Sequence, residues 1–117
     1  MIFFARDKVE NVRQKAAGGE GDILSRQPFS ADKRPERTSF KMIGEMTLSV
    51  GASVGFHVHQ EDEEIYIINQ GLGRYTGNDG RTAEVGPGDV TLTRKGEGHS
   101  LVNVGREPLV FTAVIAG

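Results

Sequence analysis

The chain has 117 residues and a mass of 12.7 kDa, the size of one domain with one hydrophobic core. It contains no cysteine, which excludes disulfides, thiolate metal sites and cysteine nucleophiles. The net charge of −2 argues against binding to nucleic acid. No apolar stretch approaches the roughly 18 residues of a membrane span, and the first residues lack a signal-peptide pattern. We therefore expect a cytoplasmic protein that binds neither nucleic acid nor membranes.

Residues 1–37 form the least regular part of the sequence. Glycines interrupt them at 18–21, and residues 28–37 are charged and contain prolines. A helical period is present only in residues 6–17. Glycine is also abundant in the whole chain, with 16 residues, and it costs about 1 kcal/mol relative to alanine inside a helix. We predict an N-terminal arm over residues 1–37 that packs on the main domain or on a partner chain, and no long helix.

From residue 38 onward, apolar and polar residues alternate, which is the period of half-buried β-strands. Glycine, proline, aspartate and asparagine separate these runs, as expected of turns. The last run is apolar on both faces, which predicts a central strand. This pattern predicts an all-β domain, either a sandwich or a barrel, over residues 38–117. The predicted strands are residues 40–50, 54–59, 64–69, 73–76, 82–85, 90–93, 99–104 and 109–115.

All three histidines of the chain lie in this strand-rich part. Because side chains alternate along a strand, His57 and His59 share one face, and Val54, Phe56 and Val58 are predicted on the other. The two histidines are separated by about 6.6 Å along the strand. Their imidazoles can therefore tilt toward one ion between them.

Two further residues are predicted to approach this pair. Glu64 begins the strand that follows an acidic turn, so a hairpin returns its carboxylate toward the histidines. His99 begins a later strand, with Asn103 on the same face. Three imidazoles and one carboxylate without a thiolate suit a divalent transition metal such as Mn, Fe, Co, Ni, Cu or Zn. Each feature alone is weak, since the acidic run 61–64 is also typical of a solvated turn, and it is the combination that indicates a metal site.

Two segments resemble the two signature motifs of the cupin superfamily. The residues that match the first motif are Gly51, His57, His59, Glu64 and Gly71. The residues that match the second motif are Gly88, Asp89, Gly96, His99 and Asn103. Arg94 is a departure from the second motif, because cupins commonly have proline there. With their flanking strands, the two motifs cover residues 40–116.

The resemblance implies a double-stranded β-helix, also called a jelly-roll β-barrel, and frequent homodimers, in which we expect the arm to cross to the second copy. It also implies one divalent metal ion held by His57, His59, Glu64 and His99. Glu63 is an alternative ligand, because both spacings occur in cupins, although the spacing to the next glycine favours Glu64.

Three more residues are candidates for contacts with the ligands or the substrate. Tyr66 has the strand parity of Glu64, so we predict that it lines the cavity. Arg94 is either a cation at the mouth of the barrel or a solvated turn charge. Asn103 either supports a metal-ligating histidine or closes its strand.

Small cupins include sugar-phosphate isomerases, dioxygenases, decarboxylases and lyases, and the fold does not choose among them. We expect a metal-dependent enzyme that acts on a small carbonyl, carboxylate or sugar-type substrate. The alternative is a non-catalytic module that binds a metal ion or a small ligand, and a third hypothesis is a metal-free structural jelly roll.

Overall fold

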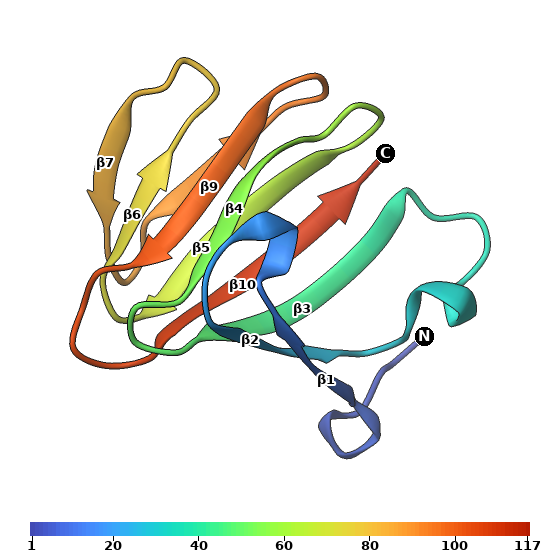
Figure 1. Cartoon of the computed structure of the whole chain (residues 1–117). Coiled ribbons are helices and arrows are strands. Elements are labelled where there is room, and N and C mark those ends of the chain that lie inside the picture. Colours follow the sequence, from blue (N-terminus) through green and yellow to red (C-terminus); the bar gives the residue numbers. More distant parts are fainter.

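The computed structural model describes residues 1–117 and consists of two antiparallel β-sheets that face each other (Figure 1). The first sheet runs in the order β1 (Val9–Gln14), β2 (Asp22–Gln27), β3 (Phe40–Leu48), β10 (Leu109–Ala116), β5 (Glu63–Gln70) and β8 (Val90–Thr93). The second sheet runs in the order β4 (Ser53–Val58), β9 (Gly98–Asn103), β6 (Gly73–Thr76) and β7 (Thr82–Val85). The predicted all-β jelly roll is confirmed.

All eight predicted strands are present, with ends that agree within two residues. The strand predicted to be central, β10, lies between β3 and β5. The only helices are the single 3₁₀ turns η1 (Ala5–Asp7), η2 (Ala16–Gly18) and η3 (Ala31–Lys33). None of them is long and apolar enough to cross a membrane.

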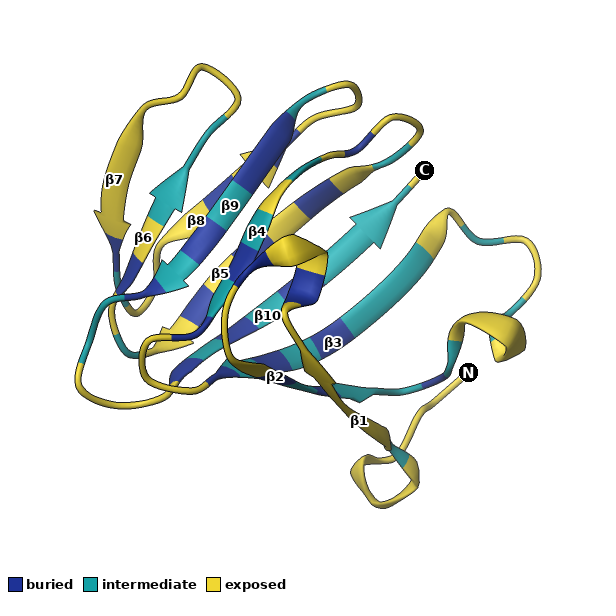
Figure 2. Ribbon diagram, viewed as in Figure 1, coloured by how far each residue is buried: buried dark blue, intermediate teal, exposed yellow.

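The core lies between the facing sheets, where alternate residues of β2, β3, β5, β8, β9 and β10 are buried (Figure 2). On β5, for example, the buried residues alternate with exposed ones, which is the pattern of a strand with one face in the core. The most fully buried side chains are Phe111, Leu48, Ile68, Leu101, Leu109, His99 and Thr93. Two of these seven are polar, so the core contains a site that needs hydrogen-bond partners.

The helical period of residues 6–17 was a misleading signal, because residues 9–14 form strand β1. β1 pairs antiparallel with β2 over its whole length, and β2 pairs with β3, where Ile23 lies opposite Leu48. Pairing with β2 satisfies the backbone groups along one edge of β1, and the valines of β1 favour a strand. Residues 1–37 thus add two strands to the first sheet of their own chain.

The turn between β1 and β2 is attached to the other sheet, where it lies against β4 (Figure 1). Ser53 N donates to the Glu20 carbonyl oxygen over 2.7 Å, and Glu20 N donates to Ser53 Oγ over 2.8 Å. Gly19 and Gly55 face each other here, and a Cβ on either would overlap the backbone of the other segment. The N-terminal segment therefore bridges both sheets along one side of the barrel.

We predict that Gly55→Ala lowers the free energy of unfolding by about 1–3 kcal/mol, because the new methyl group forces the turn of residues 16–20 away from β4. Thermal and urea unfolding measure this change. Gly86→Ala is the matched control, since a Cβ at Gly86 meets no atom closer than 3.9 Å. Equal stability of the two variants would contradict the close contact between Gly19 and Gly55.

Candidate metal centre

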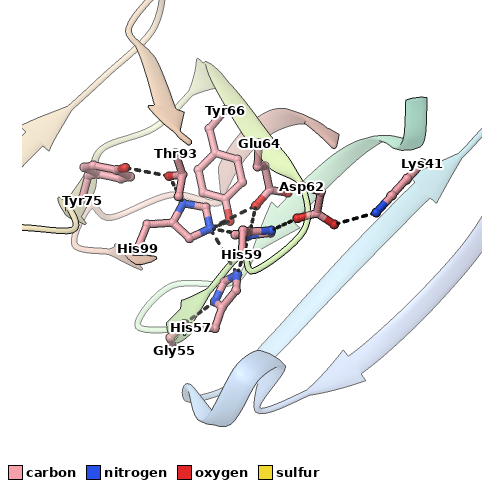
Figure 3. Close-up of polar contacts among 10 residues, drawn as sticks. All are labelled: Lys41, Gly55, His57, His59, Asp62, Glu64, Tyr66, Tyr75, Thr93 and His99. Carbon is pink, nitrogen blue, oxygen red and sulfur yellow. Dashed lines mark hydrogen bonds and ion pairs between the residues drawn. The ribbon is translucent and has the colours of Figure 1, made fainter. Parts of the chain in front are cut away.

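The three histidines and Glu64 converge between the two sheets (Figure 3). His57 on β4 lies directly opposite His99 on β9 in the strand register. His59 follows β4, where its backbone exchanges hydrogen bonds with Gly96 and Glu97 over 2.6 and 2.9 Å. Glu64 comes from β5 in the other sheet. The cluster therefore forms only when the two sheets are packed together.

The alternation predicted for β4 is correct at one end of the strand and wrong at the other. Phe56 and Val58 are exposed at 52% and 44%, on the face opposite to His57, as predicted. Val54, however, is 7% exposed and belongs to the core. The register between β4 and β9 shifts between Val54 and His57. Such a β-bulge adds one residue to a strand and reverses the side-chain parity beyond it, so Val54 and His57 both point inward.

The ligand atoms are close enough to share one ion. The three imidazole Nε2 atoms lie 3.1, 3.2 and 3.1 Å apart. Glu64 Oε1 lies 3.1 Å from His59 Nε2 and 3.0 Å from His99 Nε2. All four ligand atoms lie within 4.8 Å of one another.

These separations match neighbouring positions around a single metal ion. Two ligand atoms about 2.1 Å from an ion and at right angles to each other are about 3.0 Å apart. If one divalent ion were bound here, His57, His59, Glu64 and His99 would be its protein ligands. Glu64 lies close to His59 and His99 but makes no contact of this length with His57. An ion that accepts more than four ligands would also take oxygens of a bound molecule.

Hydrogen bonds to Nδ1 determine the orientation of the first two imidazoles. His57 Nδ1 donates to the Gly55 carbonyl oxygen over 2.8 Å, and His59 Nδ1 donates to Asp62 Oδ1 over 2.6 Å. The Asp62 carboxylate is in turn 3.5 Å from Lys41 Nζ. A carbonyl and a carboxylate only accept hydrogen bonds, so the proton of each neutral imidazole is on Nδ1 and the lone pair is on Nε2.

His99 has an equivalent support deeper in the core. Its Nδ1 is 2.8 Å from Thr93 Oγ1, which is 3.0 Å from the Tyr75 hydroxyl. His99 and Thr93 are buried, so this short chain satisfies polar groups that water does not reach. It also directs His99 Nε2 at the other two histidines.

The result is a set of facing lone pairs. With protons on Nδ1, the Nε2 atoms of His57 and His59 have no hydrogen between them at 3.1 Å, and a cation at the centre relieves their repulsion. Protonation is disfavoured at His57, because burial, together with the neighbouring His99 and His59, lowers its pKa below the usual 6.5, against the effect of the Gly55 carbonyl. The donor set thus fits a divalent metal ion.

Tyr66 lines the same space, as predicted from its parity with Glu64. Its ring stacks on His99 with centroids 4.9 Å apart, and its hydroxyl is 3.5 Å from His99 Nε2. Burial, and next the charge of Glu64, raises the pKa of Tyr66 well above its usual value of 10.0. The hydroxyl therefore stays protonated and can donate a hydrogen bond to a ligand bound at the cluster.

The structure does not bring the other candidates to the cluster. Arg94 pairs with Glu97 over 2.9 Å at an exposed turn and does not line the cavity of the histidines. The Asn103 amide donates to the carbonyl oxygens of Leu48, Ser49 and Glu107, so Asn103 closes loops at the other end of its strand. The Glu63 side chain is exposed, and the carboxylate in the cluster belongs to Glu64.

The cluster opens into a cavity of about 620 Å³. Strands of the first sheet, strand β4 and the N-terminal segment all contribute to its walls. Of its 21 lining residues, 12 are hydrophobic. The site is thus a polar centre at one wall of a mostly apolar chamber, as is common for small-molecule sites.

Comparisons with known proteins agree with this geometry. The model of the Cupin domain family matches residues 44–115. An oxalate-binding protein of Thermotoga maritima is 35% identical over 109 residues, which cover 93% of this chain and 84% of the relative. The chain therefore belongs to the cupin family.

Solved structures show the same fold. The crystal structure of a predicted oxalate decarboxylase from Thermotoga maritima is similar with a TM-score of 0.87 and 31% identity, covering 99% of this chain and 98% of that one. The polyketide cyclase RemF from Streptomyces resistomycificus has a TM-score of 0.76 at 23% identity, covering 99% of this chain and 78% of that one. The second similarity concerns the fold alone.

Sequence reasoning missed the residues that support the histidines. Asp62 lay within a run interpreted as a solvated turn, and Thr93 ends a predicted strand without any motif of its own. Metal-ligating histidines need a hydrogen-bond partner for the second ring nitrogen. This requirement predicts that each of the three histidines has such a partner. Nothing in the local sequence shows which residues they are.

We predict that Thr93→Val weakens metal binding about 10- to 100-fold, because His99 loses the partner that orients its ring. Titration calorimetry with Mn²⁺, Ni²⁺ or Zn²⁺ measures the change. Thr91→Val is a closely matched control, since Thr91 is buried on the same face of β8 and its hydroxyl has no hydrogen-bond partner. The assignment is wrong if both variants bind metal equally well.

Proposed function

We propose that this cupin holds one divalent transition metal ion through His57, His59, Glu64 and His99, and that it binds a small carboxylate there. The observation that carries the proposal is the convergence of three Nε2 atoms within 3.2 Å while each Nδ1 is occupied by another group. A bound ion supplies a positive centre that accepts the oxygens of a carboxylate or polarises a carbonyl.

The residues of the chain favour a carboxylate in this role. Tyr66 presents a protonated hydroxyl beside the cluster, which complements a negatively charged oxygen. The relative that is 35% identical is named an oxalate-binding protein, which supports the same class of ligand.

Catalysis is the second candidate function. The Tyr66 hydroxyl, 3.5 Å from His99 Nε2, can donate a hydrogen bond to a reacting group at the cluster, and the structure of 31% identity is described as a predicted oxalate decarboxylase. Apart from Glu64, however, no carboxylate lines the cavity, and the nearby Asp62 carboxylate is engaged by His59 and Lys41. Binding without turnover is therefore the function that the geometry supports best.

The oligomeric state is a separate prediction. We expect a homodimer, and a measurement of the molecular mass in solution tests this expectation.

The metal ligands lead to a first prediction about this function. We expect the metal-free protein to bind one Mn²⁺, Ni²⁺ or Zn²⁺ per chain and to gain stability that grows with the logarithm of the ratio of metal concentration to Kd. Glu64→Gln should weaken binding about 10- to 100-fold, as loss of a charged ligand does. Glu63→Gln is the control, because its carboxylate is exposed and outside the cluster. Equal metal affinity in all three proteins would refute the site.

The ligand is tested separately. Oxalate should bind the metal-loaded protein in calorimetry and should not bind the metal-free protein, because its oxygens need the ion. Carbon dioxide and formate are then measured after incubation of the loaded protein with oxalate. Unchanged oxalate supports the binding module, whereas turnover that disappears in His57→Ala establishes the enzyme. Oxalate binding of equal strength with and without metal would contradict the proposal.

A further inference from the structure

One wall of the cavity is built by the N-terminal segment. Alternate residues of β1, namely Val9, Asn11 and Arg13, face the cavity, as does the face of β2 that carries Ile23 and Ser25. The alternation shows that these strands present one continuous face to the chamber. This wall lies outside the segment that matches the cupin family, residues 44–115, and it adds polar groups that the cluster itself does not use.

Arg13 is the unpaired cation of the cavity. The other cationic side chain in the lining, Lys41, is 3.5 Å from the Asp62 carboxylate. No ion pair of the structure includes Arg13. Because Arg13 lines the cavity and takes part in no ion pair, its guanidinium is available to an anion.

Besides the histidine cluster and Arg13, the cavity has apolar walls. Ile23, Met42, Met46, Phe111 and Ala113 contribute apolar surface to it. Its volume of about 620 Å³ lies within the roughly 300–1,000 Å³ of pockets that enclose drug-sized ligands. Oxalate consists of two carboxylates joined directly, with no apolar part. When oxalate binds one ion through both ends, it leaves the apolar walls and Arg13 without a contact.

We propose that the cavity takes an organic acid with two acidic groups separated by an apolar body, one group at the metal ligands and the other at Arg13. This inference rests on the proposed carboxylate function and specifies its ligand class. The guanidinium forms two parallel hydrogen bonds with a carboxylate, which a single point charge does not. The methionines among the wall residues adapt to apolar groups of different shape. Arg13 is therefore the residue that selects a dianionic ligand over a monoanionic one.

The test uses the full-length, metal-loaded protein in titration calorimetry. The probes are oxalate, the straight-chain dicarboxylates glutarate, pimelate and azelate, and the monocarboxylates hexanoate and octanoate. We expect one of the longer dicarboxylates to bind more tightly than oxalate. Arg13→Gln should weaken that dicarboxylate about tenfold, the loss of a charge-assisted pair, and should leave oxalate and the monocarboxylates unchanged. Arg13→Lys should recover only part of the loss.

Arg106→Gln is the matched control, because Arg106 is an exposed arginine of the loop before β10 and lines no part of this cavity. It should bind every probe like the unmodified chain. Arg13 is itself exposed, so its replacement leaves the melting temperature unchanged. Three results, each with normal metal binding, overturn the inference. Arg13→Gln weakens the binding of all anions equally, Arg13→Gln weakens the binding of none, or the unmodified chain binds oxalate more tightly than every longer dicarboxylate. Failure to bind metal overturns the proposed function as well and is seen in the metal titration.

Discussion

Three imidazoles with their Nε2 atoms about 3 Å apart form a repulsive arrangement unless a cation lies among them. The protein enforces this arrangement through the opposite ring nitrogens, which are held by a carbonyl, a carboxylate and a hydroxyl. Each of these partners comes from a different place in the fold. Ligand groups that converge only in the folded chain would link metal affinity to folding.

The need to bring these groups together explains several features of the architecture. His57 and His99 are a cross-strand pair in one sheet, whereas Glu64 and Thr93 lie on neighbouring strands of the other. The ligand set therefore spans the core and depends on the packing of Phe111, which contacts Tyr66 with ring centroids 4.7 Å apart. The Nδ1 atom of each histidine has a hydrogen-bond partner in this buried position, which fixes the rings of the site.

The N-terminal segment shows how a short extension changes a common fold. It pairs with β3 on one sheet and contacts β4 on the other, and the close approach of Gly19 and Gly55 holds the turn in place. The cupin strands alone provide the metal ligands. The extension provides a wall with its own charge, and walls of this kind determine which ligands a common fold accepts.

Local sequence patterns determined the strands from residue 40 onward and the central place of β10, because alternation depends only on neighbouring residues. The resemblance to the cupin motifs identified the residues of the cluster, namely His57, His59, Glu64 and His99. Tyr66 followed from the same parity. The tertiary structure decided the rest. Residues 9–14 became a strand since β2 offered an edge to pair with, and the bulge in β4 turned Val54 inward. Asp62 and Thr93 lie only three and six residues from the histidines they support, but the turns between them bring the side chains together. Arg13 reaches the cavity wall through the pairing of β1 with β2. No local period encodes these placements.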